Sequence, residues 1–533
     1  MHDSETKTYH LVVLVHGLWG CTAHFDYISN ALDDAFHSNS LFRNGGRLEN
    51  EEIVVYTTHL NEGYKTYDGI DVCGLRVARE IEEQIEELGS VTKFSLCGYS
   101  LGGLIARYAL GALYKKQLFK KRDIRLLNFT TFCTPHVGVY APGNNFAVKL
   151  FNAILPNLLG SSGKQMFLQD CVKSANGLPL LSLMSSENSI FYNALQEFEY
   201  KALYANVIND KRTAWWTSGI SRNNPFFDVD EYNGATRFSY IPGYEPIVID
   251  HTKPIQIKRI EDAQEELGEN ADLNENQDDT DAEQRLNKNE YFFINYWIAK
   301  MGRWLMVLIN ILLIAPLYIM WFCISGVMET TKSTIRATRY VGKYSNQLIH
   351  DFYEISPEVT DDDDEVTSVL TNEYEQQIQE TLNDQRDTLI ESVFDAIERK
   401  NTYSAVVDEA SSRSESCEKE TTDGEEEHEQ EITEHSMKTT IQELEQFPIE
   451  EILARFEHNS NELPSLENFH LSLTPAQLEI IDSLNKIKWK KFPIYIRKTP
   501  STHACAIVRH ADPNFGEGEV IIRHWIEQVF RFE

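Results

Sequence analysis

The stretch CGYSLGGLIARYALGALYKK, residues 97–116, places Ser100 between two glycines. Apolar residues precede the serine and helix formers follow it, so we predict a strand over Phe94–Gly98 and a helix over Leu101–Tyr114. A Gly-x-Ser-x-Gly pattern at such a corner favours a nucleophilic serine. The glycines let strand and helix approach closely, and the sharp bend exposes the hydroxyl. The positive end of the helix would also stabilise an oxyanion at this point.

Strand and helix patterns alternate on both sides of this corner, from the N-terminus to about residue 250. Runs of β-branched residues predict buried strands, and apolar residues at helical spacing predict the helices between them. The further predicted strands are His10–Val15, Ile53–Tyr56, Leu126–Cys133 and Ala202–Ile208, and the further predicted helices are Thr22–Phe36 and Val72–Leu88. Strands joined by helices of this length indicate the α/β class, with a mostly parallel and covered central sheet.

A second ordered part is predicted at the C-terminus. Thr474 and Pro475 suit the start of a helix over Ala476–Ile487, followed by a strand over Phe492–Ile496 and a helix over Val520–Phe530. We therefore expect residues 1–250 and residues 471–533 to form one α/β domain. Residues 251–470 would be a long insert that splits it. The helical pattern over Phe146–Leu159 suits a cap over a binding site or an ordinary packed helix.

The composition limits the function classes. The net charge of −33 argues against nucleic acid as a partner, because binding phosphates needs a basic surface. Acidic runs are concentrated in the insert and contain few aromatic residues, so we expect the insert to be partly disordered. The eight cysteines show no CxxC spacing, as in reduced thiols of a protein that faces the cytosol. No cluster with metal-ligand spacing is present in the sequence, and we predict no cofactor and no metal.

A second glycine-bearing turn, HGLWG at residues 16–20, directly follows the first predicted strand. Acyl transfer needs two N–H donors directed at the developing oxyanion, and such a turn can supply one of them. We assign the oxyanion hole to the main-chain N–H groups of Leu18 and Leu101. His16 is expected to brace the loop rather than to act as the base.

Together these motifs resemble a known family. The HGLWG turn, the GYSLGG corner and the phrase FCTPHVG at residues 132–138 are similar to the fungal serine-lipase family of the α/β-hydrolase superfamily. That family includes yeast lipid-droplet phospholipases and monoacylglycerol lipases. The resemblance covers about residues 8–222 and 473–530, and it implies an α/β-hydrolase fold with serine esterase activity on lipids. His136 lies within the third motif, and we expect a structural role for it.

In this fold the acid follows the nucleophile along the chain, and the base follows the acid. Asp210 comes directly after the strand Ala202–Ile208, where a loop can turn a carboxylate toward the upper edge of the sheet. The surrounding segment YANVIND also resembles the acid segment of the family. Asp228 and Asp230 are weaker rivals, because no strand precedes them as clearly.

Two histidines compete for the role of base in the segment STHACAIVRH. His503 follows the predicted strand Phe492–Ile496, and its context resembles the histidine segment of the family. His510, seven residues further on, remains an alternative. The predicted catalytic set is therefore Ser100, Asp210 and His503.

Residues 304–327 form an apolar run of 24 residues without a charge. As a helix this run would extend about 36 Å, enough to cross a bilayer. A single crossing would separate His503 from Ser100, and no second run of comparable length follows. Pro316 lies in the middle, where it would kink a helix. We therefore expect a hairpin or an interfacial helix, although a spanning topology remains open.

The sequence thus predicts a serine-dependent esterase that hydrolyses acyl esters of phospholipids or acylglycerols through an acyl-enzyme. It would act on a lipid droplet or on the endoplasmic reticulum membrane, with the catalytic domain facing the cytosol. Its expected partners are the lipid substrate and that surface. Two alternatives stay open, a thioesterase or deacylase acting on lipidated proteins and a non-catalytic lipid-droplet adaptor. The head-group preference and the acyl position are also open.

Overall fold

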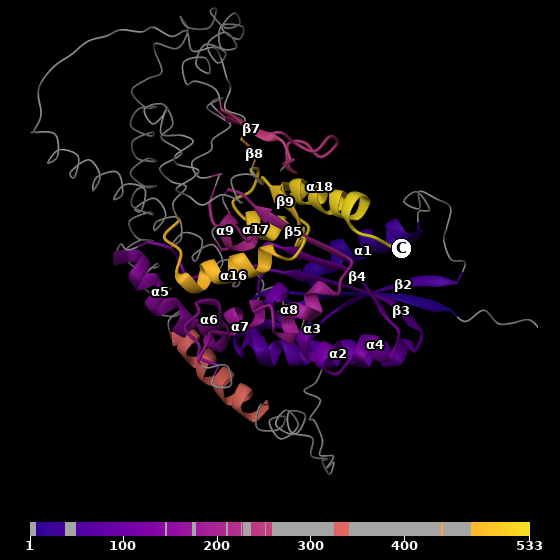
Figure 1. Cartoon of the computed structure of the whole chain (residues 1–533), viewed down its shortest axis with the longest axis horizontal. Helices are drawn as coiled ribbons and strands as arrows, with labels where there is room; N and C mark the ends of the chain where they lie inside the picture. Colours follow the sequence, from indigo (N-terminus) through magenta and orange to yellow (C-terminus); the bar gives the residue numbers. More distant parts are fainter. Residues whose placement is uncertain are drawn as a thin grey trace, which may run out of the picture.

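The computed structural model describes residues 7–37, 50–143, 146–172, 177–208, 210, 212–224, 226, 236–250, 252–257, 324–340, 439–440 and 471–533 (Figure 1). Most of the predicted insert lies outside these residues, as do Asp228 and Asp230.

A six-stranded sheet with the order β2-β1-β3-β4-β5-β9 forms the centre of the described structure, and every neighbouring pair is parallel. This confirms the predicted α/β class with a parallel sheet. The strands are β1 (Thr8–Val15), β2 (Glu51–Thr57), β3 (Val91–Tyr99), β4 (Arg125–Phe132), β5 (Tyr200–Asn206) and β9 (Lys490–Ile494). Each contains the strand core that the sequence predicts, with ends shifted by up to three residues.

The middle parts of the strands are mostly apolar because helices cover both faces of the sheet. Residues Leu11 to Leu14 of β1 are completely buried, and they alternate between two separate apolar cores. Leu11 and Val13 pack into the core that includes α2 (Ile70–Leu88) and α3 (Leu101–Lys115). Val12 and Leu14 pack into the core that includes α1 (Asp26–His37) and α18 (Gly516–His524). Figure 1 shows these helices as layers on opposite sides of the strands.

The C-terminal segment completes the same sheet. β9 pairs with β5 in the register Ala202↔Lys490 to Asn206↔Ile494. In the second core, the indole N–H of Trp525 donates to the Thr130 hydroxyl of β4 at 3.1 Å. The predicted Thr474 cap is also present, because its hydroxyl accepts from the Gln477 N–H at the start of α16 (Pro475–Asn485). Residues of the C-terminal segment 471–533 are therefore part of the same α/β core.

Two predicted helices differ in detail. The region predicted as Thr22–Phe36 begins with a 3-10 turn, η1 (Thr22–Phe25), before α1. The predicted closing helix starts earlier, at Gly516, and ends in the π-helical turn η9 (Trp525–Val529). An aromatic side chain lies at each of these places, Phe25 in η1 and Trp525 in η9, and both are completely buried in the second core.

Helices between β4 and β5 cover the carboxyl end of the sheet on the first core's side. They are α5 (Phe146–Leu158), α6 (Gly160–Met166), α7 (Leu180–Ser185) and α8 (Ile190–Gln196), of which α5 matches the predicted Phe146–Leu159. A separate helix over 324–340 lies beside α5 and α6 (Figure 1). The remaining elements are α4 (Leu118–Lys121), η2 (Gly63–Tyr67), α9 (Trp215–Ser218), α17 (Thr502–Cys505), η8 (Pro513–Phe515), β6 (Thr236–Arg237), β7 (Pro254–Ile257) and β8 (Thr439–Thr440).

Only the last four residues of the predicted apolar run 304–327 are described, and they form the first turn of the helix over 324–340. Its remaining residues, including Pro316, lie outside the described residues. Within the part of the chain that the structure describes, no helix combines the length and apolar character needed to cross a membrane.

Candidate active site

Ser100 lies at the corner between β3 and α3 with a strained backbone, at φ 53° and ψ −131°. Residues other than glycine adopt such a positive φ only where the surroundings enforce it. The close approach of strand and helix provides that constraint. A Cβ added to Gly102 would lie 2.1 Å from the carbonyl oxygen of Val15, and one added to Gly98 would lie 2.4 Å from the Cα of Gly103. Both glycines are thus required for the corner that exposes the serine.

The HGLWG turn lies directly against this serine. A Cβ on Gly17 would lie 2.7 Å from the Cβ of Ser100, so only glycine fits there. The turn is closed by the Gly20 N–H, which donates to the Gly17 carbonyl at 3.0 Å. Leu18 of the turn and Leu101 of α3 both line the same pocket as Ser100. The structure therefore brings together the two residues whose N–H groups the sequence assigns to an oxyanion hole.

Asp210 and His503 meet through a direct hydrogen bond. The Nδ1 atom of His503 lies 2.8 Å from the Oδ2 atom of Asp210, and both side chains are buried. Asp210 follows β5, and His503 belongs to α17, which comes after β9. Because β5 and β9 are neighbouring parallel strands, their carboxyl ends carry these two side chains to the same edge of the sheet.

The carboxylate of Asp210 is held by further hydrogen bonds. Its Oδ1 atom accepts from the backbone N–H groups of Arg212 and Thr213, both at 3.0 Å. Its Oδ2 atom accepts from the Thr213 hydroxyl at 2.9 Å. Burial by itself would raise the pKa of Asp210, but the charge of His503 and the hydrogen bonds from His503 and Thr213 outweigh it. The pKa of this carboxyl is therefore lower than that of an ordinary aspartate.

His503 also contacts Tyr99, the residue before the serine. The Tyr99 hydroxyl donates to the His503 carbonyl oxygen at 3.0 Å, and the two rings lie 5.0 Å apart. The Nε2 atom of His503 is buried without a hydrogen-bond partner among the described residues. His503 and Ser100 line one pocket. With Nδ1 directed to the carboxylate, Nε2 is the atom that remains to exchange a proton with the serine.

The alternative base, His510, lies elsewhere. Its side chain is exposed, and its ring packs against Phe515 at a centroid distance of 4.9 Å. The structure thus joins His503 to Asp210 by a hydrogen bond, while His510 sits on the surface beyond α17.

The other two histidines of the quoted motifs are enclosed. His16 is buried, its Nδ1 lies 3.1 Å from the Gly17 carbonyl oxygen, and burial lowers its pKa. His136 is completely buried, with its Nε2 atom 3.0 Å from the Thr131 hydroxyl, and burial lowers its pKa well below the ordinary value. These surroundings fit the loop-bracing role expected for His16 and the structural role expected for His136.

Thr213 is a site residue that sequence reasoning missed. Its hydroxyl donates to Asp210 and lies 3.4 Å from the Nδ1 atom of His503. A threonine three residues after an aspartate commonly forms local hydrogen bonds of this kind, and that spacing was the available signal. This spacing predicts a local turn, but it does not indicate that the turn holds the carboxylate that pairs with His503.

Cys133 also adjoins the pair. Its sulfur and the ligand atoms of Asp210 and His503 all lie within 4.8 Å of one another, a spacing that a metal ion could use. The protonation state of the Cys133 thiol does not suit metal binding. Burial raises the pKa of the Cys133 thiol well above its ordinary value, whereas metal binding needs the thiolate. Both oxygens of Asp210 already accept hydrogen bonds. We therefore interpret the three residues as an acid–base pair with a neutral thiol beside it.

The pocket in front of Ser100 is small and mostly apolar, with a volume of about 80 Å³. Leu155 and Leu159 from α5 and its C-terminal end, and Met166 and Phe167 from the end of α6, form its apolar wall. The charged side chains that line it are Arg212 and Arg509. The α5 segment therefore contributes Leu155 to the wall of this pocket, as a cap over a binding site would.

A parallel sheet with a strained serine after β3, and an Asp–His pair after β5 and β9, is the arrangement that serine hydrolases with an α/β-hydrolase fold use. The predicted resemblance to a serine esterase family is confirmed, because residues 5–221 match the family described as "Putative serine esterase (DUF676)".

The chain is also similar to individual proteins that are described as putative lipases. The chain is 27% identical over 247 residues to "Putative lipase YDL109C" of Saccharomyces cerevisiae, covering 46% of this chain and 35% of the relative. It is 27% identical over 219 residues to "Putative lipase ROG1" of the same yeast, covering 40% and 29%. The chain thus spans about a third of the length of the curated relatives it matches. A solved structure, phospholipase PlaB from Legionella pneumophila, aligns with 39% of this chain and 40% of its own at 13% identity and a TM-score of 0.23.

Proposed function

We propose that this protein is a serine-dependent lipid esterase that hydrolyses acyl esters through an acyl-enzyme. The observation that carries the proposal is the buried hydrogen bond between His503 and Asp210, with the histidine opening on the same pocket as Ser100. In this arrangement Asp210 binds the Nδ1 atom of His503, and the Nε2 atom has no partner among the described residues. A non-catalytic adaptor would not need such an arrangement. The same arrangement is expected for a general base.

The proposed mechanism follows from the geometry. The Nε2 atom of His503 takes the proton of the Ser100 hydroxyl, and the serine oxygen attacks the ester carbonyl carbon. Asp210 keeps Nδ1 protonated and stabilises the imidazolium that forms. The N–H groups of Leu18 and Leu101 stabilise the oxyanion. His503 then gives the proton to the leaving alcohol, and a water molecule repeats the sequence to release the fatty acid.

The pocket supports a lipid as the substrate. Its wall is apolar where α5 and α6 meet it, as an acyl chain requires. Its volume of about 80 Å³ is below the roughly 300–1,000 Å³ of typical small-molecule sites, so it encloses only part of a long chain. The rest of the substrate must then remain outside the pocket, and a lipid surface would accommodate it there.

The charge of the pocket favours phospholipids within this class. The charged residues that line it, Arg212 and Arg509, are both cationic. In a chain with a net charge of −33, a pocket lined by arginines favours an ester that carries a negative charge. The phosphate of a phospholipid supplies that charge, whereas an acylglycerol has none.

The site of action in this proposal is a lipid droplet or the cytosolic face of the endoplasmic reticulum. The support is the uncharged run 304–327, which is long enough to enter lipid, together with the apolar pocket wall. A hairpin or an interfacial helix would keep Ser100 and His503 on one side of the lipid surface.

Product analysis tests this function most directly. Purified protein would be incubated with mixed phospholipids and acylglycerols, and the released products identified by mass spectrometry. Release of fatty acids, mainly from phospholipids, by the wild type but not by Ser100→Ala supports the proposal. Release from neutral glycerides alone would contradict the assignment to phospholipids, and cleavage only of acyl-cysteine peptides would favour the thioesterase.

A further inference from the structure

The exposed apolar side chains of this protein are concentrated in one place. Among the described residues, eight large hydrophobic side chains are exposed, and seven of them belong to α5 or to the helix over 324–340. These seven are Phe146, Leu150, Ile154, Ile324, Val327, Met328 and Ile335, with exposed fractions from 46% to 80%. The eighth, Leu178, lies outside both helices. A concentration of this kind marks a surface that contacts a protein partner or a membrane.

The helix over 324–340 is inverted relative to an ordinary surface helix. Its small and polar residues Ser325, Glu329 and Ser333 are buried against the protein, at spacings of four residues. Its large apolar residues Ile324 and Ile335 are instead 59% and 48% exposed. A surface helix of a soluble protein normally turns its apolar stripe toward the core. The outward stripe therefore needs a different apolar environment.

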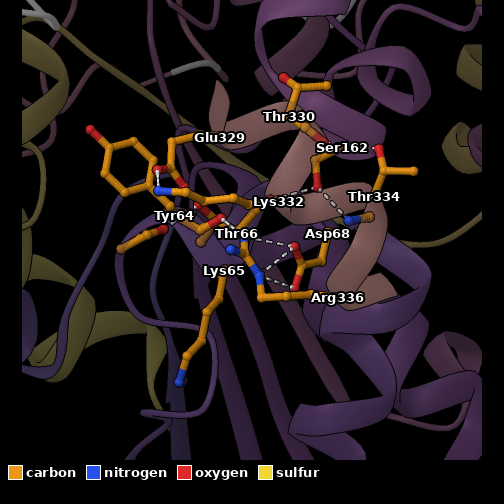
Figure 2. Close-up of polar contacts among 12 residues, drawn as sticks. Tyr64, Lys65, Thr66, Asp68, Ser162, Glu329, Thr330, Lys332, Thr334 and Arg336 are labelled. Carbon is orange, nitrogen blue, oxygen red and sulfur yellow. Dashed lines mark hydrogen bonds and ion pairs between the residues drawn. The ribbon is translucent and has the colours of Figure 1, made fainter. Parts of the chain in front are cut away.

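An ion pair fixes the orientation of this helix. Figure 2 shows the guanidinium group of Arg336 directed at the carboxylate of Asp68. The Nη2 atom of Arg336 lies 3.0 Å from the Oδ1 atom of Asp68. The Asp68 side chain is completely buried and also accepts from Arg76 at 2.8 Å. Arg336 donates in addition to the Tyr64 carbonyl at 3.1 Å. The polar face of the helix is thus held toward the protein by specific contacts.

The same helix lies directly against α5, so the two outward stripes adjoin. The Thr330 hydroxyl donates to the Asn157 carbonyl at 3.2 Å. A Cβ added to Gly326 would lie 3.2 Å from the side chain of Leu158. On α5 the exposed residues Phe146, Leu150 and Ile154 recur every four residues, which places them on one face. We call the exposed faces of α5 and of the helix over 324–340 the apolar face.

The charges of the apolar face are cationic. Its exposed charged residues are Lys149, Lys332 and Arg339. The acidic residue of these two helices, Glu329, is buried and pairs with Lys332 at 2.7 Å. The chain as a whole has 82 acidic and 49 basic residues, so the lack of exposed acids on these two helices contrasts with its composition. Apolar stripes with Lys and Arg beside them suit a lipid leaflet that contains anionic head groups.

From these observations we propose that the apolar face docks onto a lipid leaflet containing anionic lipids. The apolar run 304–327 supports a lipid leaflet as the binding partner. In the sequence this run leads directly into the helix over 324–340 and ends within the first turn of that helix. Docking would also place the pocket at the lipid surface, since Leu155 of α5 is part of the pocket wall. Only this last consequence, entry of substrate from the leaflet, rests on the proposed esterase function.

A matched pair of positions tests the docking. Leu150 on the apolar face and Leu178 outside it are the same residue type, and both are 46% exposed. Each is replaced by cysteine in the full chain, in a background with Cys171→Ser, and labelled with a nitrobenzoxadiazole fluorophore. The background without an added cysteine gives the blank. All variants carry Ser100→Ala, so that lipid is not consumed and the result does not depend on catalysis.

The measurement is quenching by aqueous iodide with and without vesicles of phosphatidylcholine and phosphatidylserine. We expect vesicles to shift the emission at position 150 to the blue and to reduce its quenching severalfold, with no change at position 178. Equal quenching at the two positions in vesicle-bound protein would overturn the proposal, even if the apolar run anchors the chain. Absence of binding to these vesicles would overturn it as well.

The charge component has its own test. Lys149→Gln with Arg339→Gln should weaken binding to the phosphatidylserine vesicles by about fivefold for each cation lost. Binding to vesicles of phosphatidylcholine alone should stay unchanged. An equal loss on both kinds of vesicle, or no loss on either, would contradict the requirement for anionic lipid.

Discussion

The Nδ1 atom of His503 lies 2.8 Å from the Oδ2 atom of Asp210, although 293 residues separate them in the sequence. The long stretch between them does not disturb this contact, because β5 and β9 pair directly and bring both residues to the same edge of the sheet. The chemistry proposed above depends on this relationship.

Replacing the acid should abolish most of the activity while the fold persists. Asp210→Asn keeps the size of the side chain, but its amide favours the wrong tautomer of His503. We expect kcat for ester hydrolysis to fall by about 10⁴. Steady-state kinetics with a soluble ester measure this loss, and an unchanged Tm shows that the fold is retained. A variant with more than a tenth of the wild-type kcat would contradict the role of Asp210.

The Thr213 hydroxyl should act as a positioning group. Thr213→Val removes the hydrogen bond to Asp210 and keeps the backbone N–H that binds the other carboxylate oxygen. We expect kcat to fall about tenfold with little change in KM, since a hydrogen bond to a charged group contributes about 1.5–3 kcal/mol. Thr213→Ser should restore kcat. If the serine variant were as slow as the valine variant, the effect would come from packing.

The glycine at the serine corner should tolerate no side chain. In Gly102→Ala the new Cβ would lie 2.1 Å from the backbone oxygen of Val15, so strand and helix must separate. We expect a loss of stability of about 1–3 kcal/mol together with loss of activity. Gly516→Ala is the matched control, because nothing lies within 4 Å of its added Cβ and its backbone is already helical. Denaturant unfolding compares the two, and equal stability would be incompatible with the observed corner.

Stability should depend on pH through Asp170. Burial raises the pKa of this carboxyl to about 6, although the Leu180 N–H donates to it at 2.8 Å. Between about pH 4 and pH 6 the folded state therefore binds more protons than the unfolded chain, and the group becomes destabilising as the pH rises. Asp170→Asn should raise Tm by a few degrees at pH 7 and leave it unchanged at pH 4. Thermal unfolding at the two pH values measures this, and an equal shift at both would refute the ionisation.

The sheet could be predicted well because its strands are buried on both faces. The run around Val12 is apolar at every position. Such a run between two amphipathic helices predicts a strand that is buried on both faces. Ser100, Asp210 and His503 could be chosen as candidate site residues from the sequence for a related reason. Each follows a predicted strand, and parallel strands bring their carboxyl ends to one edge.

Other features depend on contacts between distant segments, and the sequence patterns do not contain them. The helix over 324–340 presents its apolar stripe outward, and tertiary contacts such as that between Arg336 and Asp68 show which face is buried. The role of Thr213 depends on where Asp210 points. The 3-10 turn before α1 carries the buried Phe25, and helical spacing alone did not predict this turn.

Covalent labelling tests the central claim most directly. A fluorophosphonate probe is applied to the full chain, and the modified residue is identified by mass spectrometry of peptides. We predict a single adduct on Ser100 that disappears in His503→Ala and persists in His510→Ala. Absence of an adduct in the wild type, or labelling that depends on His510 and not on His503, would contradict the account.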